Sequence, residues 1–403
     1  MKKLWNKDFI LMLQGNAVSA IGDLLYSVAI GYWVYEKTGS SALMGIMSSI
    51  SMFVVMFLSP FVGTIVDKCS RKTIIVGMDA ARGVLMLAVG ALAFSDNLSV
   101  PIVLAAAFLA ALCSVFFNPA VGTLMIDLIP HDDMVRGQSV SNGVSSAINL
   151  LGKAFSGVLV AFLGVPLVIV LNGISYLISA LTEMFIRVPQ TPQQGQPVSF
   201  ASVVRDLKIA FQAIFSNRFL KLFIPCAMIV NLLGSGPFTL LLPFVLEKGF
   251  AVDAYGYLMS VEMAGSLICV TLLGILKLKP KTRLWAMGIG FIGSVLLYTV
   301  GYLTGNFLFM CVMFFLGSFA SSLGNAIFNA ALMLALPEEN RAAILGFVNS
   351  AAVGGSALSA VIFGVMGDLF PLSLVFVVGG LLSAGPMVYM CVHKNTRQFI
   401  LEH

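Results

Sequence analysis

The stretch Gly63-Thr64-Ile65-Val66-Asp67-Lys68-Cys69-Ser70-Arg71-Lys72 decides the fold. It places four charged side chains within six residues, and apolar sequence of about twenty residues or more flanks it on either side. Such a cluster of charges has to lie in water or at a membrane surface, because a charged side chain is costly inside the hydrocarbon core. The stretch therefore predicts a short surface loop between two membrane-spanning segments.

The composition of the whole chain agrees with this interpretation. Of the 403 residues, 59% are hydrophobic and only 10% are charged, whereas a soluble globular domain carries about 25% charged residues. The six cysteines are scattered and show neither metal-ligand spacing nor a disulfide framework. We therefore expect a polytopic membrane protein, with no metal site and no nucleic-acid partner despite the net charge of +5.

Twelve apolar runs are long enough to cross a bilayer as helices, which are the structures that satisfy every backbone group in lipid unless the chain forms a barrel. The predicted spans are 9–35, 42–66, 73–95, 100–129, 137–163, 165–187, 219–246, 254–276, 284–303, 306–336, 342–369 and 371–393. The sequence therefore predicts an all-α integral membrane protein with twelve transmembrane helices.

The basic residues predict the orientation. With the N-terminus in the cytoplasm, all but four of the 23 Lys and Arg residues fall in cytoplasmic loops or ends. Lys37 and Lys248 lie outside, and Arg82 and Lys153 lie within spans. Cytoplasmic loops carry an excess of basic residues, so we expect a multi-pass protein of the cell membrane with both termini cytoplasmic.

A polar insert at 188–217 divides the chain into the halves 1–187 and 218–403. It begins as a flexible Pro- and Gln-rich linker and then becomes amphipathic, which predicts a helix on the cytoplasmic membrane surface. The apolar face of this helix comprises Val203, Val204, Leu207, Ala210, Phe211 and Ile214, with Arg205 and Lys208 off it.

The two halves repeat one another without a gap over their first spans. Glu36-Lys37 reappears as Glu247-Lys248, Gly63 as Gly274, and Lys72 as Arg283. Matched segments share an orientation only if each half has six spans. The sequence therefore predicts two pseudo-repeated six-helix bundles, an arrangement typical of secondary transporters.

The charged loop, the twelve spans and the duplication together resemble the major facilitator superfamily. The first span, with Gly22-Asp23 and the following Tyr35-Glu36-Lys37-Thr38-Gly39-Ser40, is similar to the branch that contains macrolide-efflux and siderophore-export proteins. The resemblance covers nearly the whole chain. It implies the major facilitator fold and transport by alternating access between the two sides of the membrane.

The same resemblance implies a cytoplasmic latch in which the loop charges engage an acid at the end of the fourth span. Its members here are Gly63, Asp67, Lys68, Arg71, Lys72 and Asp127. The alternative is that these charges only reflect the excess of basic residues in cytoplasmic loops, an excess to which Asp67 contributes nothing. Ser70 stands where the family usually has glycine, so we expect a less tight turn.

Two departures from the family pattern concern positive charge. Antiporters of the family usually carry an arginine midway along the fourth span, where this chain has Ala110, and a proline in the fifth span, where it has Lys153. One hypothesis is that the positive charge has moved from one helix to another.

Three charges lie deep within predicted spans and are candidates for ion coupling or for lining a cavity. Asp23, Lys153 and Glu262 each lie roughly 14–18 Å from the outer ends of their spans. Lys153 and Glu262 could form an ion pair that is made in one state and broken in another, or a static bridge could join Lys153 to either acid. Asn149 lies one turn before Lys153 and shares its face.

The remaining charges within spans have simpler interpretations. Asp79 and Arg82 lie three residues apart on one helix face, so we expect a local structural pair. Glu183 and Asp368 lie near span ends and are expected to reach the membrane interface.

The favoured function is secondary active transport: proton-coupled efflux of hydrophobic or amphiphilic small molecules. No nucleotide-binding loop and no metal-binding histidine motif occurs, so we expect no cofactor and no enzymatic activity. The alternatives are a lipid or lysophospholipid transporter and a proton symporter for uptake. A membrane enzyme is disfavoured by short loops that are poor in catalytic residues, and a sensor is disfavoured because we expect no added soluble domain. The expected partners are the substrate, protons and membrane lipids, and the expected state is a monomer.

Overall fold

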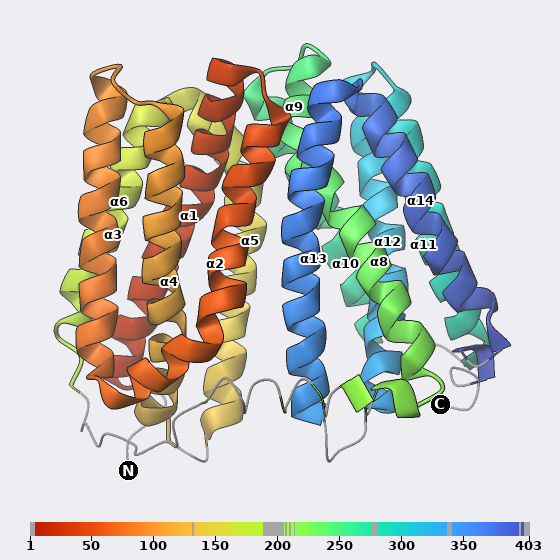
Figure 1. Cartoon of the computed structure of the whole chain (residues 1–403), viewed down its shortest axis with the longest axis horizontal. Coiled ribbons are helices and arrows are strands. Elements are labelled where there is room, and N and C mark those ends of the chain that lie inside the picture. Colours follow the sequence, from red (N-terminus) through yellow and green to blue (C-terminus); the bar gives the residue numbers. More distant parts are fainter. Residues whose placement is uncertain are drawn as a thin grey trace. The chain divides into compact units, whose positions relative to one another are not determined.

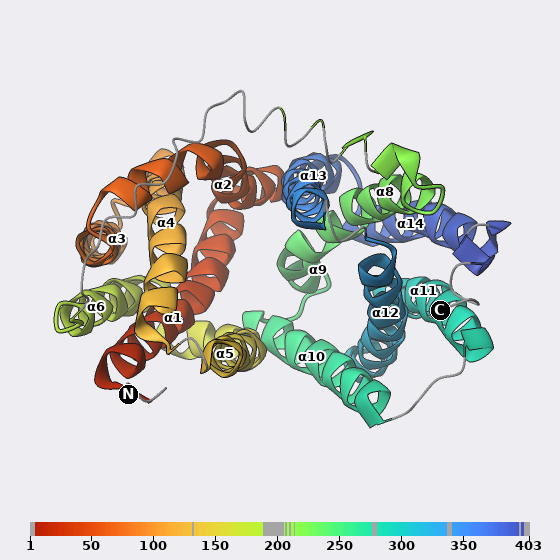
Figure 2. The same ribbon diagram turned by 90° about the horizontal axis from the view of Figure 1, so that it is seen from below.

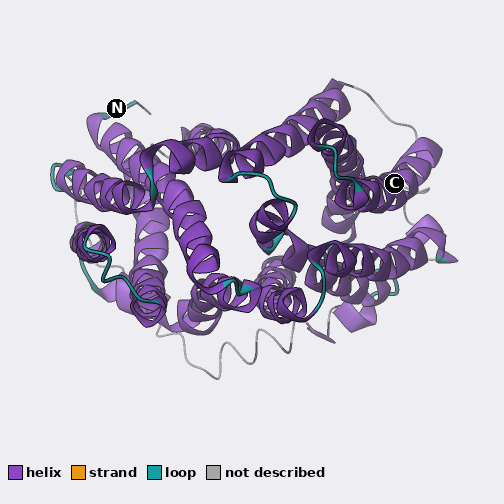
Figure 3. Ribbon diagram, turned by 90° about the horizontal axis from the view of Figure 1, so that it is seen from above, coloured by secondary structure: helices purple, strands orange, loops and turns teal. Residues whose placement is uncertain are grey.

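The computed structural model describes residues 5–130, 133–187, 205, 208, 211–212, 214–275, 280–336, 341–394 and 396–398. Throughout these ranges the regular structure is helical, without a strand (Figures 1 and 3). Eleven of the described helices are long and apolar enough to cross a membrane. The helix α5, with 30 residues, is long enough to be a twelfth span. The predicted all-α membrane fold is confirmed.

The described chain forms two compact units. The first unit contains the residues up to Gly39 and from Ile50 to Arg187. Its helices are α1 (Lys7–Thr38), the larger part of α2 (Ser41–Lys68), α3 (Arg71–Phe94), α4 (Val100–Leu128), α5 (Met134–Leu163) and α6 (Val165–Glu183). Helix α6 packs against α1 and α3, α3 packs against α4, and α1 packs against α5 (Figure 2).

The second unit contains the first turns of α2, from Ser40 to Ser49, and the described residues from 205 onwards. Its helices are α8 (Leu220–Thr239), α9 (Leu241–Glu247), α10 (Val252–Ile275), α11 (Pro280–Leu303), α12 (Phe307–Ala335), α13 (Arg341–Leu369) and α14 (Leu372–Val392). Helix α12 packs against α10 and α11, and α8 packs against α13 and α14.

The charged stretch 63–72 ends α2 and begins α3. Only Cys69 and Ser70 separate the two helices. Ser70 caps α3, because its hydroxyl accepts a hydrogen bond from the backbone N–H of Thr73 at 3.3 Å. Such a cap satisfies one of the free N–H groups at a helix start, which gives the serine at this position a local role.

The predicted span 219–246 is wrong in one respect, because it forms two helices rather than one. Helix α8 ends at Thr239 and α9 begins at Leu241. Pro243 has no N–H to donate to the carbonyl of Thr239, and its ring would clash with that carbonyl in a continuous helix. The interruption at Leu240 follows from this proline.

The predicted surface helix lies only partly within the described residues. Residues 188–204 lie outside them, whereas 205, 208, 211–212 and 214–216 are helical. Ile214 is buried in a core cluster of the second unit with Phe219 and Phe223, and Phe211 is exposed. Attachment of this segment to the membrane surface stays a prediction.

Candidate functional site

Arg82 of α3 is the centre of a buried polar cluster in the first unit. Its side chain is only 5% exposed and forms an ion pair with Asp79, one turn earlier. The guanidinium lies between two aromatic rings, with its Cζ atom 4.3 Å from the ring centre of Phe117 and 4.4 Å from that of Tyr176. Nη1 donates a hydrogen bond to Ser114 Oγ at 3.4 Å. A flat cation between two rings is well stabilised where water is excluded.

Asp23 of α1 joins the same cluster through α6. The hydroxyl of Tyr176 donates a hydrogen bond to Asp23 Oδ1. The two helices approach closely here, because a Cβ atom on Gly22 would lie 2.4 Å from Asn172 Oδ1. A larger residue at position 22 would force the Asn172 side chain to shift, so glycine allows this approach, which brings the carboxyl group of Asp23 against the Tyr176–Arg82 stack.

Glu183, the last residue of α6, is the third acid of the cluster. It is 1% exposed, and its Oε1 accepts a hydrogen bond from Ser179 Oγ at 3.3 Å. The side chain is buried within the first unit, and the expectation that Glu183 lies at the membrane interface stays a prediction. The helix ends four residues before the predicted limit, and the backbone N–H of Arg187 donates to Asp8 Oδ1 at 2.9 Å, which ties this end of α6 to the start of α1.

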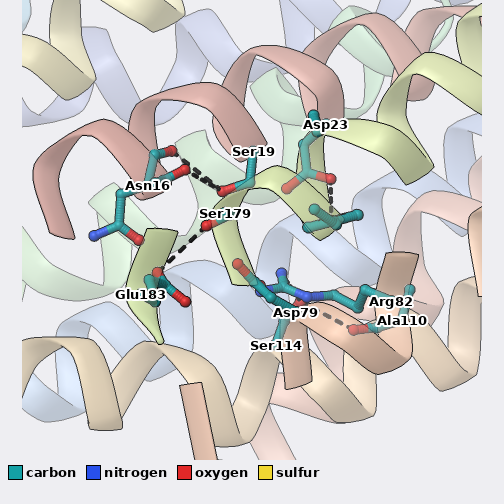
Figure 4. Close-up of polar contacts among 12 residues, drawn as sticks. Asn16, Ser19, Asp23, Asp79, Arg82, Ala110, Ser114, Ser179 and Glu183 are labelled. Atoms are coloured by element: carbon teal, nitrogen blue, oxygen red, sulfur yellow. Dashed lines mark hydrogen bonds and ion pairs between the residues drawn. The ribbon is translucent and has the colours of Figure 1, made fainter. Parts of the chain in front are cut away.

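We call these residues the acid–arginine cluster: Asp23, Asp79, Arg82, Tyr176, Ser179 and Glu183. Figure 4 shows its charged members gathered between α1, α3 and α6. Three carboxyl groups share one guanidinium. If all four groups were ionised, the cluster would carry a net charge of −2, which a low-dielectric interior strongly disfavours.

A cavity of about 380 Å³ opens onto this cluster. Asp23 and Arg82 line it together with Asn16, Ser114, Asn118 and Asn149. Asn149, predicted as a cavity residue, is exposed there, and its Nδ2 donates to the carbonyl of Ser145 at 2.9 Å. The cavity wall thus presents a carboxylate, a guanidinium and neutral amides.

The second unit holds two cavities of a different character, each of about 320 Å³. Both are lined by Asn231 and Asn325. Tyr298, Tyr302 and Phe376 line the first of them. None of the described residues that line either cavity is charged.

The predicted pairing of Lys153 cannot be followed in the described side chains. Lys153 lies in α5, but its side chain is outside the described residues. Glu262, in α10, is half-buried. Its Oε1 accepts a hydrogen bond from the Tyr298 hydroxyl at 3.3 Å, and its carbonyl oxygen accepts one from Ser318 Oγ at 2.6 Å. The pairing of Lys153 with Glu262 or Asp23 stays a prediction.

Part of the expected latch is seen in the first unit. Arg71, at the start of α3, forms an ion pair with Asp127 near the end of α4, and the two side chains are 13% and 29% exposed. Lys72 is half-buried in the same first turn. Gly63, Asp67 and Lys68 belong to the last turns of α2, with side chains outside the described residues. The switching role of these residues stays a prediction.

Sequence reasoning did not identify Arg82 as a cation beside the middle of α4, the helix in which Ala110 stands where related antiporters usually have arginine. Ser114 Oγ, which receives the hydrogen bond from Arg82, itself donates to the carbonyl of Ala110 at 2.9 Å. The guanidinium therefore lies one helical turn from Ala110, although it belongs to α3 and not to α4. A cation is present beside the middle of α4, supplied by the neighbouring helix.

Asp368, near the end of α13, caps the start of α2 within the second unit. Its Oδ1 accepts from the backbone N–H of Ser41 at 2.5 Å and of Ala42 at 3.3 Å, and its Oδ2 accepts from Ser40 Oγ at 2.6 Å. A carboxylate at a helix N-terminus satisfies free N–H groups and complements the helix dipole. Asp368 therefore fixes this end of α2 to α13.

We expect Asp368→Asn to loosen the first turn of α2. The variant loses the charge on the helix N-terminus, an interaction of about 0.5–1 kcal/mol at an exposed site. Hydrogen exchange followed by mass spectrometry should show faster exchange of the Ser41 and Ala42 amides. Asp253→Asn is the matched control, because Asp253 lies in the first turn of α10 and should leave α2 unaffected. Equal exchange in Asp368→Asn and the wild type would refute the cap.

Comparison with known proteins places the chain in a family. The profile of the Major Facilitator Superfamily matches residues 12–298 and 226–398. Macrolide efflux protein A of Streptococcus pyogenes is 24% identical over 217 residues, which is 53% of each chain, so the match spans about half the length of that relative. The uncharacterised transporter YfiS of Bacillus subtilis (strain 168) is 23% identical over 93% of this chain and 90% of its own.

Solved structures share the fold over nearly the whole chain. The nucleoside transporter NupG superposes with a TM-score of 0.70 at 16% identity, covering 95% of this chain and 100% of its own. A bacterial homologue of the human lysosomal transporter Spinster gives a TM-score of 0.70 at 13% identity, covering 98% and 95%. The predicted resemblance is confirmed. The chain belongs to the Major Facilitator Superfamily.

Proposed function

We propose that this transporter exports hydrophobic or amphiphilic small molecules in exchange for protons by alternating access. One observation carries the proposal: the cavity of the first unit is lined by Asp23 and Arg82, an acid and a base held in a membrane-spanning bundle. Charged groups at such depth are expensive and mark ion pathways. We place the protein in the cell membrane as a monomer, with both termini in the cytoplasm.

The proposed substrate class follows from the cavities of the second unit. Aromatic rings and amides line them, without a charge among the described lining residues. Ligand sites of this composition bind largely apolar molecules and orient them with a few polar groups. Export, rather than uptake, is supported by the names of relatives, such as macrolide efflux protein A and the putative bacilysin exporter BacE of Bacillus subtilis, which is 28% identical over 49% of this chain.

Asp23 is the proposed coupling acid. As a carboxylate it accepts the hydrogen bond of Tyr176 and lies in the field of Arg82. As a neutral carboxyl it loses most of its attraction to the guanidinium. Binding and release of one proton thus change the contacts that hold α1 against α3 and α6, and a ligand shifts a conformational equilibrium only through such differential contacts.

The test uses proteoliposomes with an imposed proton gradient. A lipophilic cation, a macrolide and a lysophospholipid are added in turn, and collapse of the gradient is followed with a pH-sensitive dye. We expect collapse with the cation or the macrolide, together with accumulation of that compound driven by the gradient. Movement of lysophospholipid alone, independent of pH, would overturn the proposal in favour of lipid transport. Co-transport of compound and protons in the same direction would overturn it in favour of uptake.

A further inference from the structure

Two carboxyl groups lie behind the wall of the charged cavity, out of contact with water. Asp79 is 0% exposed and Glu183 is 1% exposed. The Ser179 hydroxyl donates to Glu183 Oε1 and also interacts with the carboxyl group of Asp79. One serine therefore connects two buried acids that belong to neighbouring helices, α3 and α6.

Among the described residues, Glu183 has no cation of its own. The charged groups that act on it are Asp79 and Arg82, both from α3. Arg82 is already paired with Asp79. Glu183 Oε2 is buried and has no hydrogen-bond partner within the described residues. An unpaired carboxylate in such a place costs several kcal/mol, so the site requires a neutralising ligand.

The side of Glu183 that faces α1 is closely packed, which favours a proton as the ligand there. Helix α1 presents Gly15 to it, and a Cβ atom there would lie 3.1 Å from Glu183 Oε1 and 2.8 Å from Ser179 Oγ. Because the site has no room on this side for one additional carbon atom, it does not accommodate a hydrated metal ion. A proton adds no volume.

Polar groups lie along α6 between Glu183 and the residues that line the cavity. Along α6, Tyr176, Ser179 and Glu183 follow at spacings of three and four residues and share one face, spanning roughly 10 Å. Tyr176 contacts Asp23 and Arg82, which line the cavity, and Ser179 lies between Glu183 and Asp79. Figure 4 shows Ser179 and Glu183 beside the Asp79–Arg82 pair.

We propose that Glu183 is a second proton-binding site, which exchanges its proton with Asp79 through Ser179. The transfer is balanced once the Ser179 hydroxyl, which donates to Glu183 in the structure, rotates towards Asp79 Oδ2, a buried atom without a hydrogen-bond partner among the described residues. Ser179 then gives its proton to Asp79 while the Glu183 carboxyl gives its own proton to Ser179 Oγ. The net result is one proton moved from Glu183 to Asp79. The inference deepens the proposed function, on which it rests for its role in coupling.

Infrared difference spectroscopy of the purified full-length protein in lipid tests the site without any substrate. The difference between the spectra at neutral and at high pH should contain the C=O band of a buried carboxyl group that is protonated at neutral pH. We expect this band to be lost in Glu183→Gln. It should move to higher frequency in Ser179→Ala, because the carbonyl loses its hydrogen bond. Glu183→Gln has the same shape and removes a buried charge, so it should remain folded.

Other outcomes overturn the inference. A band that persists in Glu183→Gln and disappears in Asp79→Asn would assign the proton to Asp79. A pH-dependent signal that is replaced by a sodium-dependent one would assign the site to a metal cation. The spectra decide the proton site even if the proteoliposome assay shows no gradient-driven transport, so failure of this inference is distinguishable from failure of the proposed function.

Discussion

Arg82→Gln is expected to abolish gradient-driven transport and to lower the free energy of unfolding by about 3–5 kcal/mol. Arg82 is the one cation within the acid–arginine cluster, and its loss leaves the carboxyl group of Asp79 fully buried without its partner. Removing one member of a buried ion pair is costly because the other member keeps its desolvation penalty. Thermal unfolding of the purified protein in detergent measures the effect.

A double variant distinguishes the effect of Arg82 on transport from its effect on stability. Arg82→Gln combined with Asp79→Asn removes both members of the pair and should recover most of the lost stability, as replacement of whole buried pairs often does. Transport should not recover, because Asp23 still lacks its cation. Arg82→Lys keeps the charge but loses the flat guanidinium between Phe117 and Tyr176, so we expect intermediate stability. Wild-type stability in Arg82→Gln would contradict the structural importance of the pair.

Much of the fold could be predicted from the sequence because lipid imposes simple rules on it. Apolar runs separated by charge mark the helices, and the described helix limits mostly agree with the predicted ones to within a few residues. The pairing of Asp79 with Arg82 was predictable because an i,i+3 spacing places both on one helix face. The break before α9 was also open to prediction, since Pro243 lies inside the run.

The candidate site was harder to predict because its contacts join helices that are distant in sequence. Glu183 was assigned to the interface from its place near the end of an apolar run, but its burial depends on Gly15 of α1. One signal was available: Asn172, Tyr176, Ser179 and Glu183 form a polar stripe at helical spacing. No sequence pattern indicated that residues 40–49 belong to the second unit, because an apolar pattern does not show which helices pack against one another.

Asp23→Asn is expected to uncouple transport from the proton gradient while substrate still moves down its own concentration gradient. An amide cannot take up the proton, so the contacts of α1 with the Tyr176–Arg82 stack no longer change with protonation. A hydrogen bond to a charged group contributes about 1.5–3 kcal/mol, and we therefore expect gradient-driven accumulation to fall by about ten- to hundredfold. Accumulation in proteoliposomes, with and without the gradient, measures the change.

The control is a neutral residue of the same cavity. Asn149 lines the wall with Asp23 but carries no ionisable group, so Asn149→Ala should keep the response to the gradient. Tyr176→Phe keeps the carboxyl group and removes its hydrogen bond, and should shift the pH dependence of transport without abolishing it. If Asp23→Asn still responds to the gradient as the wild type does, the proton binds at another acid, and the cavity in the first unit then serves the substrate.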